Sequence, residues 1–183
     1  MKATPTHLEG VVVLEPRVFS DERGFFTELY REERYRELGL PAFVQDNLAG
    51  SRKGVLRGLH YQWPRPQGKL VYVLSGSVLD VAVDVRPGSP DFGRSVAVEL
   101  SEHNRQQLWI PEGFAHGYLV LSEFALVGYK CSDVYVPEYD RVIRWNDPQL
   151  AIRWPLDQPI LSAKDRSAPL LAEAAPLLPH ASP

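Results

Sequence analysis

The chain has 183 residues, of which 44% are hydrophobic and 23% charged, and it carries a formal net charge of −3. This is the composition of an ordinary soluble globular protein, and its slight acidity without a basic block argues against a nucleic-acid partner. The single cysteine, Cys131, excludes an internal disulfide framework and a cysteine-rich zinc site.

The hydrophobic runs and the first residues bear on location and domain count. No run of about 18 apolar residues is present, and the N-terminal residues lack a charged region followed by an apolar one. We therefore expect no membrane partner and a cytoplasmic location. A chain of this length buries enough surface to fold as one domain, 1–183, and no linker divides it.

The front part of the chain predicts short strands and one helix. A polar turn at 20–24 leads into the second strand, and Gly39 and Pro41 end the helix. The alternation of the third strand sets Gln45 and Asn47 on one face. In chain order, the expected elements are strands at 9–15 and 25–30, a helix at 31–38 and a strand at 43–51.

The segment 54–69 reads as a strand, a proline-rich loop and a second strand that opens on Lys69. The strand presents His60 on a rigid element, and the glycines at 54 and 58 leave room beside it for another backbone or a ligand. The alternative interpretation is that His60 is a core residue whose ring nitrogens are simply hydrogen-bonded. Strict alternation predicts one face with Leu56, Gly58, His60 and Gln62, and a second with Val55, Arg57, Leu59 and Tyr61.

From Lys69 onward the chain is rich in short β runs separated by turn residues. This spacing, near ten residues, favours an antiparallel sandwich or barrel. The tail from Ala168 has no clear periodicity, and we expect 170–183 to be poorly ordered or peripheral. The predicted strands are 69–74, 77–86, 95–100, 107–110, 117–121 and 125–131.

Two histidine segments resemble the paired motifs of the cupin superfamily. The segment 111–116, Pro-Glu-Gly-Phe-Ala-His, matches the second cupin motif, which implies a mainly β, cupin-type jelly-roll barrel with a few short helices. The first motif departs from its metal-binding version, because Gln62 stands where a second histidine would be. Two histidines beside a lysine do not supply the three ligands that a catalytic metal needs, so we expect no metal and an acid–base role for His60.

An acid–base histidine needs an orienting carboxylate, and a reaction that moves a proton between two faces needs a group opposite. Spacing alone does not choose among the candidates. The possible orienters are Asp84, Asp140 and Asp165, and the possible opposing groups are Tyr118, Tyr129 and Tyr135.

An ordered set of motifs resembles the dTDP-4-dehydrorhamnose 3,5-epimerase family over about residues 5–170. Any one of these motifs is weak evidence, whereas their shared order along the chain is specific. The matching segments are 21–26 (Asp-Glu-Arg-Gly-Phe-Phe), 57–62 (Arg-Gly-Leu-His-Tyr-Gln), 76–86, 111–117, 144–148 (Arg-Trp-Asn-Asp-Pro) and 161–165 (Leu-Ser-Ala-Lys-Asp), together with Lys69.

This resemblance implies four catalytic roles. His60 matches the general base, and Asp165 matches the carboxylate that orients it. Tyr129 matches the general acid on the opposite face of the sugar, and Lys69 matches the cation beside the ketone oxygen.

The resemblance also implies a substrate-binding set and a homodimer. Arg23 matches a nucleotide contact that the family supplies from the neighbouring subunit, and Asp140 stands where the family pattern has a glutamate. The residues expected to contact phosphate or sugar oxygens are Arg57, His116 and Lys164. The residues expected to contact the nucleotide are Phe26, Glu28, Gln45, Asn47 and Tyr135.

The residues suit this chemistry independently. Removing a proton beside a ketone forms an enolate, which needs a base working near pH 7 and fixed positive charge at the developing oxyanion. The expected function is therefore a cofactor-independent epimerase acting at C3 and C5 of dTDP-4-dehydro-6-deoxy-D-glucose, a dTDP-4-keto-6-deoxyhexose. The alternatives are an epimerase acting at C3 or C5 only, a non-catalytic nucleotide-sugar-binding cupin, and a metal-dependent cupin oxygenase.

Overall fold

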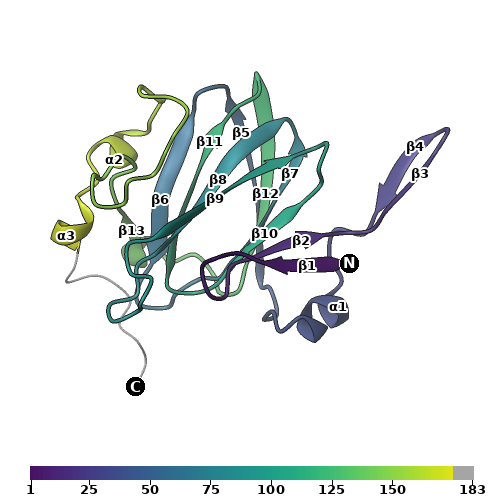
Figure 1. Cartoon of the computed structure of the whole chain (residues 1–183), viewed down its shortest axis with the longest axis horizontal. Helices are drawn as coiled ribbons and strands as arrows, with labels where there is room; N and C mark the ends of the chain where they lie inside the picture. Colours follow the sequence, from purple (N-terminus) through teal and green to yellow (C-terminus); the bar gives the residue numbers. More distant parts are fainter. Residues whose placement is uncertain (175–183) are drawn as a thin grey trace.

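The structure, a computed structural model, describes residues 1–174 and is built mainly of antiparallel strands (Figure 1). Its strands are β1 (Lys2–Pro5), β2 (Val12–Glu15), β3 (Val18–Asp21), β4 (Gly24–Thr27), β5 (Gln45–Arg52), β6 (Leu56–Gln62), β7 (Lys69–Ser75), β8 (Ser77–Asp84), β9 (Ser95–Ser101), β10 (Gln107–Ile110), β11 (Phe114–Val120), β12 (Phe124–Cys131) and β13 (Asp140–Val142). Its helices are α1 (Glu32–Glu37), the 3-10 helix η1 (Pro137–Tyr139), α2 (Ala163–Arg166) and α3 (Leu171–Ala174).

Two sheets face each other and enclose the main core. The larger sheet has six strands in the order β1-β2-β10-β7-β12-β5, and the smaller has five in the order β13-β6-β11-β8-β9. Inward side chains from both sheets form one cluster, in which Val71 and Val127 of the larger sheet join Val78 and Ala82 of the smaller. Sheet pairing of this kind gives the predicted fold class, a cupin-type antiparallel barrel with few short helices.

The outer face of each sheet is also partly covered. Helix α1 follows from the predicted helix-forming run, and its Tyr35 packs with Leu70 and Trp109 on the larger sheet. The chain after β13 covers the smaller sheet, where Ile143 and Leu171 pack against the outward side chains of β8. This covering segment also carries α2, which brings the C-terminal part of the chain next to β6.

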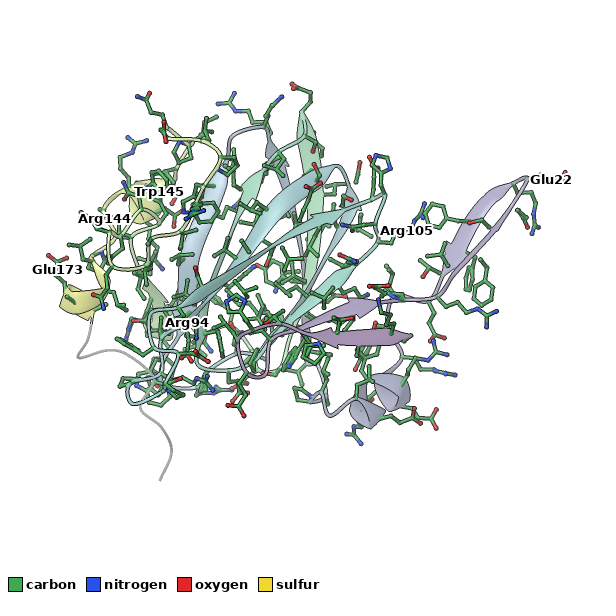
Figure 2. All side chains as sticks on the ribbon, in the orientation of Figure 1. Glu22, Arg94, Arg105, Arg144, Trp145 and Glu173 are labelled. Carbon is green, nitrogen blue, oxygen red and sulfur yellow. The ribbon has the colours of Figure 1, made fainter. Side chains whose placement is uncertain are left out.

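Several observed elements differ from those predicted. The turn at 20–24 lies inside a projecting hairpin of β3 and β4, with Glu22 at its tip (Figure 2). The short strands β1, β3 and β13 were not predicted. Residues 171–174, which the sequence assigned to the tail, form α3 with Leu171 buried, and 175–183 lie outside the described residues. No helix among residues 1–174 is long and apolar enough to cross a membrane.

The predicted strict alternation along 54–62 was wrong at Gly58. Its φ is +135°, and an added Cβ would lie 2.5 Å from the Cα of Gly117, which confirms the predicted close backbone approach. On β11, His116 and Tyr118 are two residues apart, whereas their partners on β6, His60 and Arg57, are three apart. This β-bulge turns Arg57 and His60 to the same side of the sheet, where both line one cavity.

Candidate active site

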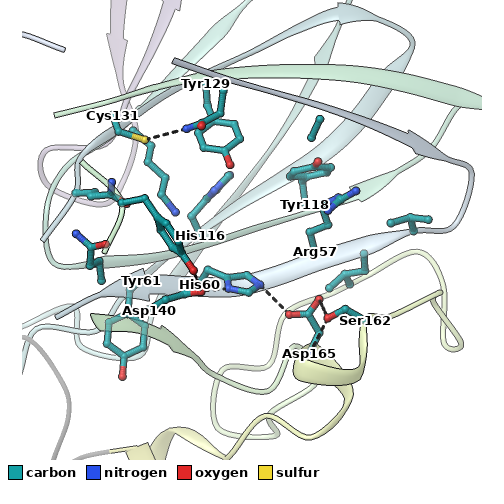
Figure 3. Close-up of a pocket in the computed structure, with 18 of the residues that line it drawn as sticks. Arg57, His60, Tyr61, His116, Tyr118, Tyr129, Cys131, Asp140, Ser162 and Asp165 are labelled. Atoms are coloured by element: carbon teal, nitrogen blue, oxygen red, sulfur yellow. Dashed lines mark hydrogen bonds and ion pairs between the residues drawn. The ribbon is translucent and has the colours of Figure 1, made fainter. Parts of the chain in front are cut away.

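A cavity of about 560 Å³ opens between the two sheets, and its walls come from β5, β6, β7, β11, β12 and the chain after β12 (Figure 3). Most of the predicted site residues meet here although they are far apart in sequence. Those that line the cavity are Gln45, Asn47, Arg57, His60, Lys69, His116, Tyr129, Tyr135, Asp140 and Asp165.

His60 lies between two carboxylates. Its Nε2 is 2.7 Å from Oδ1 of Asp165, and its Nδ1 is 3.5 Å from Oδ1 of Asp140. Burial alone would lower the pKa of His60, but the two carboxylates outweigh it, so this pKa is raised above its usual value even though Lys69 opposes them. The imidazole is thus held in place and kept more basic than a free histidine.

Asp165 is fixed by the first turn of α2. Ser162 precedes this helix, and its hydroxyl accepts a hydrogen bond from the Asp165 backbone N–H at 3.0 Å and donates one to Asp165 Oδ2 at 2.8 Å. Burial would raise the pKa of Asp165, but His60 and Ser162 outweigh it and lower the pKa. Of the three candidate orienters, Asp84 is excluded, because it is buried and bound to Arg86.

Asp140 comes from β13, the strand that pairs with β6. Its Oδ2 accepts hydrogen bonds from Tyr135 Oη at 3.0 Å and from Lys164 Nζ at 2.5 Å. Burial works against the charged form, yet His60, Lys164 and Tyr135 hold the pKa of Asp140 well below its usual range. Lys164 does not line the cavity itself and reaches it through this carboxylate.

Lys69 and Tyr129 face the cavity from neighbouring strands, β7 and β12. The ammonium of Lys69 makes no ion pair among the described residues, and burial lowers its pKa, although Cys131 and Asp140 partly offset that effect. Burial raises the pKa of Tyr129, so its phenol keeps its proton at neutral pH. The cavity therefore holds a buried lysine side chain and a phenol that can donate a proton within one wall.

A second histidine–carboxylate pair is more deeply buried than His60. Nε2 of His116 is 2.9 Å from Oδ2 of Asp80, and both residues are buried. Asp80 lies within the matched segment 76–86, but the sequence predicted no role for it. It belongs to the same strand as Ala82, which packs in the main core. Nearby, Arg57 donates to Ser51 through Nε at 3.1 Å.

Gln45 and Asn47 lie on one face of β5, as predicted, and line the cavity. Gln45 donates to Oδ1 of Asn47 at 3.1 Å, and its Oε1 accepts from the Tyr135 backbone N–H at 2.7 Å. Gln45 therefore binds the segment that carries Tyr135. Asn47 in turn lies 3.6 Å from the sulfur of Cys131.

Three of the predicted site residues, Arg23, Phe26 and Glu28, lie outside this cavity. Arg23 sits in the turn of the projecting hairpin, paired with Asp21, and its side chain is 84% exposed. Phe26 and Glu28 line a different hollow of about 520 Å³, and Glu28 pairs with Arg34 at 2.8 Å. Within one chain, these residues do not meet the cavity that contains His60.

Among residues 1–174, no three His, Cys, Asp or Glu side chains form a cluster that could hold a metal ion. The residues that do cluster are acid–base groups and hydrogen-bond donors. Held in an antiparallel barrel, such groups define a site suited to acid–base chemistry.

The comparisons with known proteins narrow this class. The model of the family described as dTDP-4-dehydrorhamnose 3,5-epimerase matches residues 5–173, and the chain belongs to that family. The dTDP-4-dehydrorhamnose 3,5-epimerase of Pseudomonas aeruginosa is 54% identical over 177 residues, which cover 95% of this chain and 98% of that protein.

Two further relatives bear on the substrate and on which carbons react. The crystal structure of dTDP-6-deoxy-D-glucose-3,5-epimerase from Legionella pneumophila, in complex with dTDP-4-keto-L-rhamnose, superposes with a TM-score of 0.96 at 53% identity, covering 100% of this chain and 99% of that one. The dTDP-4-dehydrorhamnose 3-epimerase of Streptomyces niveus is 39% identical over 98% of this chain and 89% of that protein.

Proposed function

We propose that this protein is a cytoplasmic enzyme that inverts C3 and C5 of dTDP-4-dehydro-6-deoxy-D-glucose, giving dTDP-4-dehydro-L-rhamnose in dTDP-L-rhamnose biosynthesis. The observation that carries the proposal is a histidine flanked by two carboxylates in a cavity that also contains Lys69 and Tyr129. The bound sugar nucleotide of the Legionella pneumophila relative supports the same substrate class.

His60 acts as the general base. Its Nε2 lies against Asp165 at 2.7 Å, whereas its Nδ1 is 3.5 Å from Asp140, so Nδ1 is the less tightly paired nitrogen and is the one that accepts a proton from the sugar. Asp165 holds the ring orientation and stabilises the imidazolium that forms. Because the carboxylates raise the pKa of His60, the neutral ring is a stronger base than free imidazole.

Lys69 and Tyr129 complete the proton transfer. Losing a proton from C3 or C5 places negative charge on the C4 oxygen, and the Lys69 ammonium stabilises that oxyanion by an amount on the order of 3 kcal/mol. Tyr129 returns a proton to the other face of the carbon, which inverts it. Both carbons flank the same ketone, so a flip of the sugar ring lets one set of groups serve both. The net reaction moves protons only: after each inversion His60 releases its proton to water and Tyr129 takes one up from water, so both groups are reset.

The enzyme works as a homodimer in which the hairpin β3–β4 reaches the neighbouring active site. Support comes from the apolar exposure of this hairpin, where the side chains of Phe19, Phe25 and Phe26 are 50%, 57% and 69% exposed. Arg23 lies in its turn with the guanidinium in solvent. Mixing an Arg23→Ala protein with a His60→Ala protein should restore activity, since mixed dimers hold one intact site. No restored activity would contradict the shared site.

Deuterium incorporation tests the reaction. The protein is incubated with dTDP-4-dehydro-6-deoxy-D-glucose in D2O, and label at C3 and C5 is followed by NMR. Label at both carbons is the expected result. Label at C3 alone would instead indicate the activity named for the Streptomyces niveus relative, and no label at either carbon would refute the enzyme. A His60→Ala variant should bind dTDP and incorporate no label.

A further inference from the structure

Gln62 is a buried polar residue to which the proposed reaction gives no role. It ends β6, two residues after His60, and only 4% of it is exposed. It stands where metal-binding members of the cupin superfamily would have a second histidine. Its side chain lines the cavity but makes its contacts with the backbone beside it.

The amide of Gln62 makes three hydrogen bonds with backbone groups. Its Nε2 donates to the carbonyl of Arg65 at 2.6 Å and to that of Val134 at 3.1 Å. Its Oε1 accepts from the N–H of Val136 at 2.7 Å. Only one orientation of the amide satisfies two acceptors and one donor, and an imidazole, with two ring nitrogens, could not make all three bonds.

These bonds hold both neighbours of Tyr135. The segment 134–136 belongs to no strand or helix, and the Tyr135 side chain is half exposed, so packing does little to fix it. Hydrogen bonds hold it instead. Gln62 binds the residue on each side, Gln45 accepts from the Tyr135 N–H, and Asp140 accepts from its hydroxyl.

We propose that Gln62 is a positioning residue that holds the segment 134–136 so that Tyr135 stays at the mouth of the cavity, ready to contact the nucleobase of the substrate. This inference rests on the proposed function for the identity of the ligand. Ordering the segment before binding removes an entropic cost from the binding step, so Gln62 should affect affinity more than the chemical step.

A Gln62→Met variant tests the proposal, because methionine keeps the length of the side chain and removes all three bonds. We expect amide hydrogen exchange at Val136 to speed up at least about 10-fold, and the Kd for dTDP and the KM to rise by about 10-fold. The kcat should fall less than about 3-fold, because His60 and Asp165 make no hydrogen bond with the segment 134–136 and Asp140 keeps its bond from Lys164.

A Gln107→Met variant is the matched control. Gln107 is also a buried amide, which donates to the carbonyl of Leu29 at 2.8 Å and accepts from the Tyr35 hydroxyl at 2.6 Å, away from the cavity. It should lose stability but keep the Kd for dTDP. If Gln62→Met fails to fold, Gln62→Glu removes both donors, retains the oxygen facing Val136, and should still weaken dTDP binding.

A double-mutant comparison separates positioning from general loosening. In a Tyr135→Ala background, Gln62→Met should leave the Kd for dTDP unchanged, because the residue it positions is gone. An equal loss of affinity in both backgrounds would overturn the proposal, as would unchanged exchange at Val136. The exchange measurement uses the free protein, so it remains decisive even if the deuterium experiment rejects the epimerase reaction.

Discussion

Replacing Asp140 by asparagine should move the acid limb of the pH profile of kcat/KM to lower pH. The limb arises because only neutral His60 can act as a base, so the rate falls as the pH drops through the pKa of His60. Asp140 and Asp165 raise this pKa against the opposing effects of burial and Lys69. Asparagine keeps the shape of the side chain and removes one of the two negative charges, so the pKa of His60 should fall.

The geometry sets the size of the shift. At the 3.5 Å between His60 Nδ1 and Asp140 Oδ1, two unit charges interact by about 1.2 kcal/mol in water and about 4.7 kcal/mol at an effective dielectric constant of about 20. These energies correspond to roughly 1 to 3.5 pKa units. Lys164 is only 2.5 Å from the same carboxylate and cancels much of its field, which favours the low end. The expected shift is therefore about one pH unit downward.

The assay is the initial rate of epimerisation between about pH 5 and 9 at low substrate concentration, which reports kcat/KM and the pKa values of the free enzyme. Asp46→Asn is the control, because Asp46 pairs with Lys130 at 2.6 Å and does not face His60. Its limb should stay in place. An Asp140→Asn limb that stays in place or moves to higher pH would refute the placement of Asp140 as the carboxylate facing the base.

Three further predictions concern other parts of the chain. Lys69→Met should lower kcat by about 100-fold while calorimetry gives an unchanged Kd for dTDP, and a rate near that of the parent would remove Lys69 from the mechanism. Gly58→Ala should lower the free energy of unfolding in urea by at least about 2 kcal/mol, because Gly58 has a φ of +135° and the new Cβ would collide with the backbone of Gly117. A variant as stable as the parent would contradict the bulge geometry. Asp84→Asn should make stability less sensitive to acid. Burial raises the pKa of Asp84, but Arg86 and Ser89 outweigh it, so its contribution is present above about pH 4 and lost as the pH falls through the lowered pKa; an equal acid dependence of unfolding in both proteins would count against this.

The strands between 69 and 131 could be predicted closely, because their alternation and turn residues are local features of the sequence. The strands β1, β3 and β13 could not, since each has three or four residues that are mostly polar or exposed. Such segments become strands only because a partner strand lies beside them. The hairpin of β3 and β4 shows the same limit, because its turn was found while its first strand was not.

The candidate site was likewise predictable only in part. The residue types were visible in the motifs, but spacing could not choose between Asp84, Asp140 and Asp165 as partners of His60. Two of them contact its ring, one on each nitrogen, and the third belongs to a separate ion pair with Arg86. The position of the bulge at Gly58 was also hidden, since one inserted residue changes the face of a strand without changing its composition.

The location of the two carboxylates indicates which parts of the chain raise the pKa of His60. His60 belongs to β6, which lies next to the edge strand β13 of the smaller sheet. Asp140 and Asp165 lie on segments that follow β12, the last strand of the larger sheet along the chain. Strand β13 carries the first, and the capped turn of α2 carries the second. The barrel alone would present a half-buried imidazole beside the Lys69 ammonium, and both surroundings lower its pKa. The segments added after the barrel reverse that effect, so they make the histidine a base as well as cover the sheet.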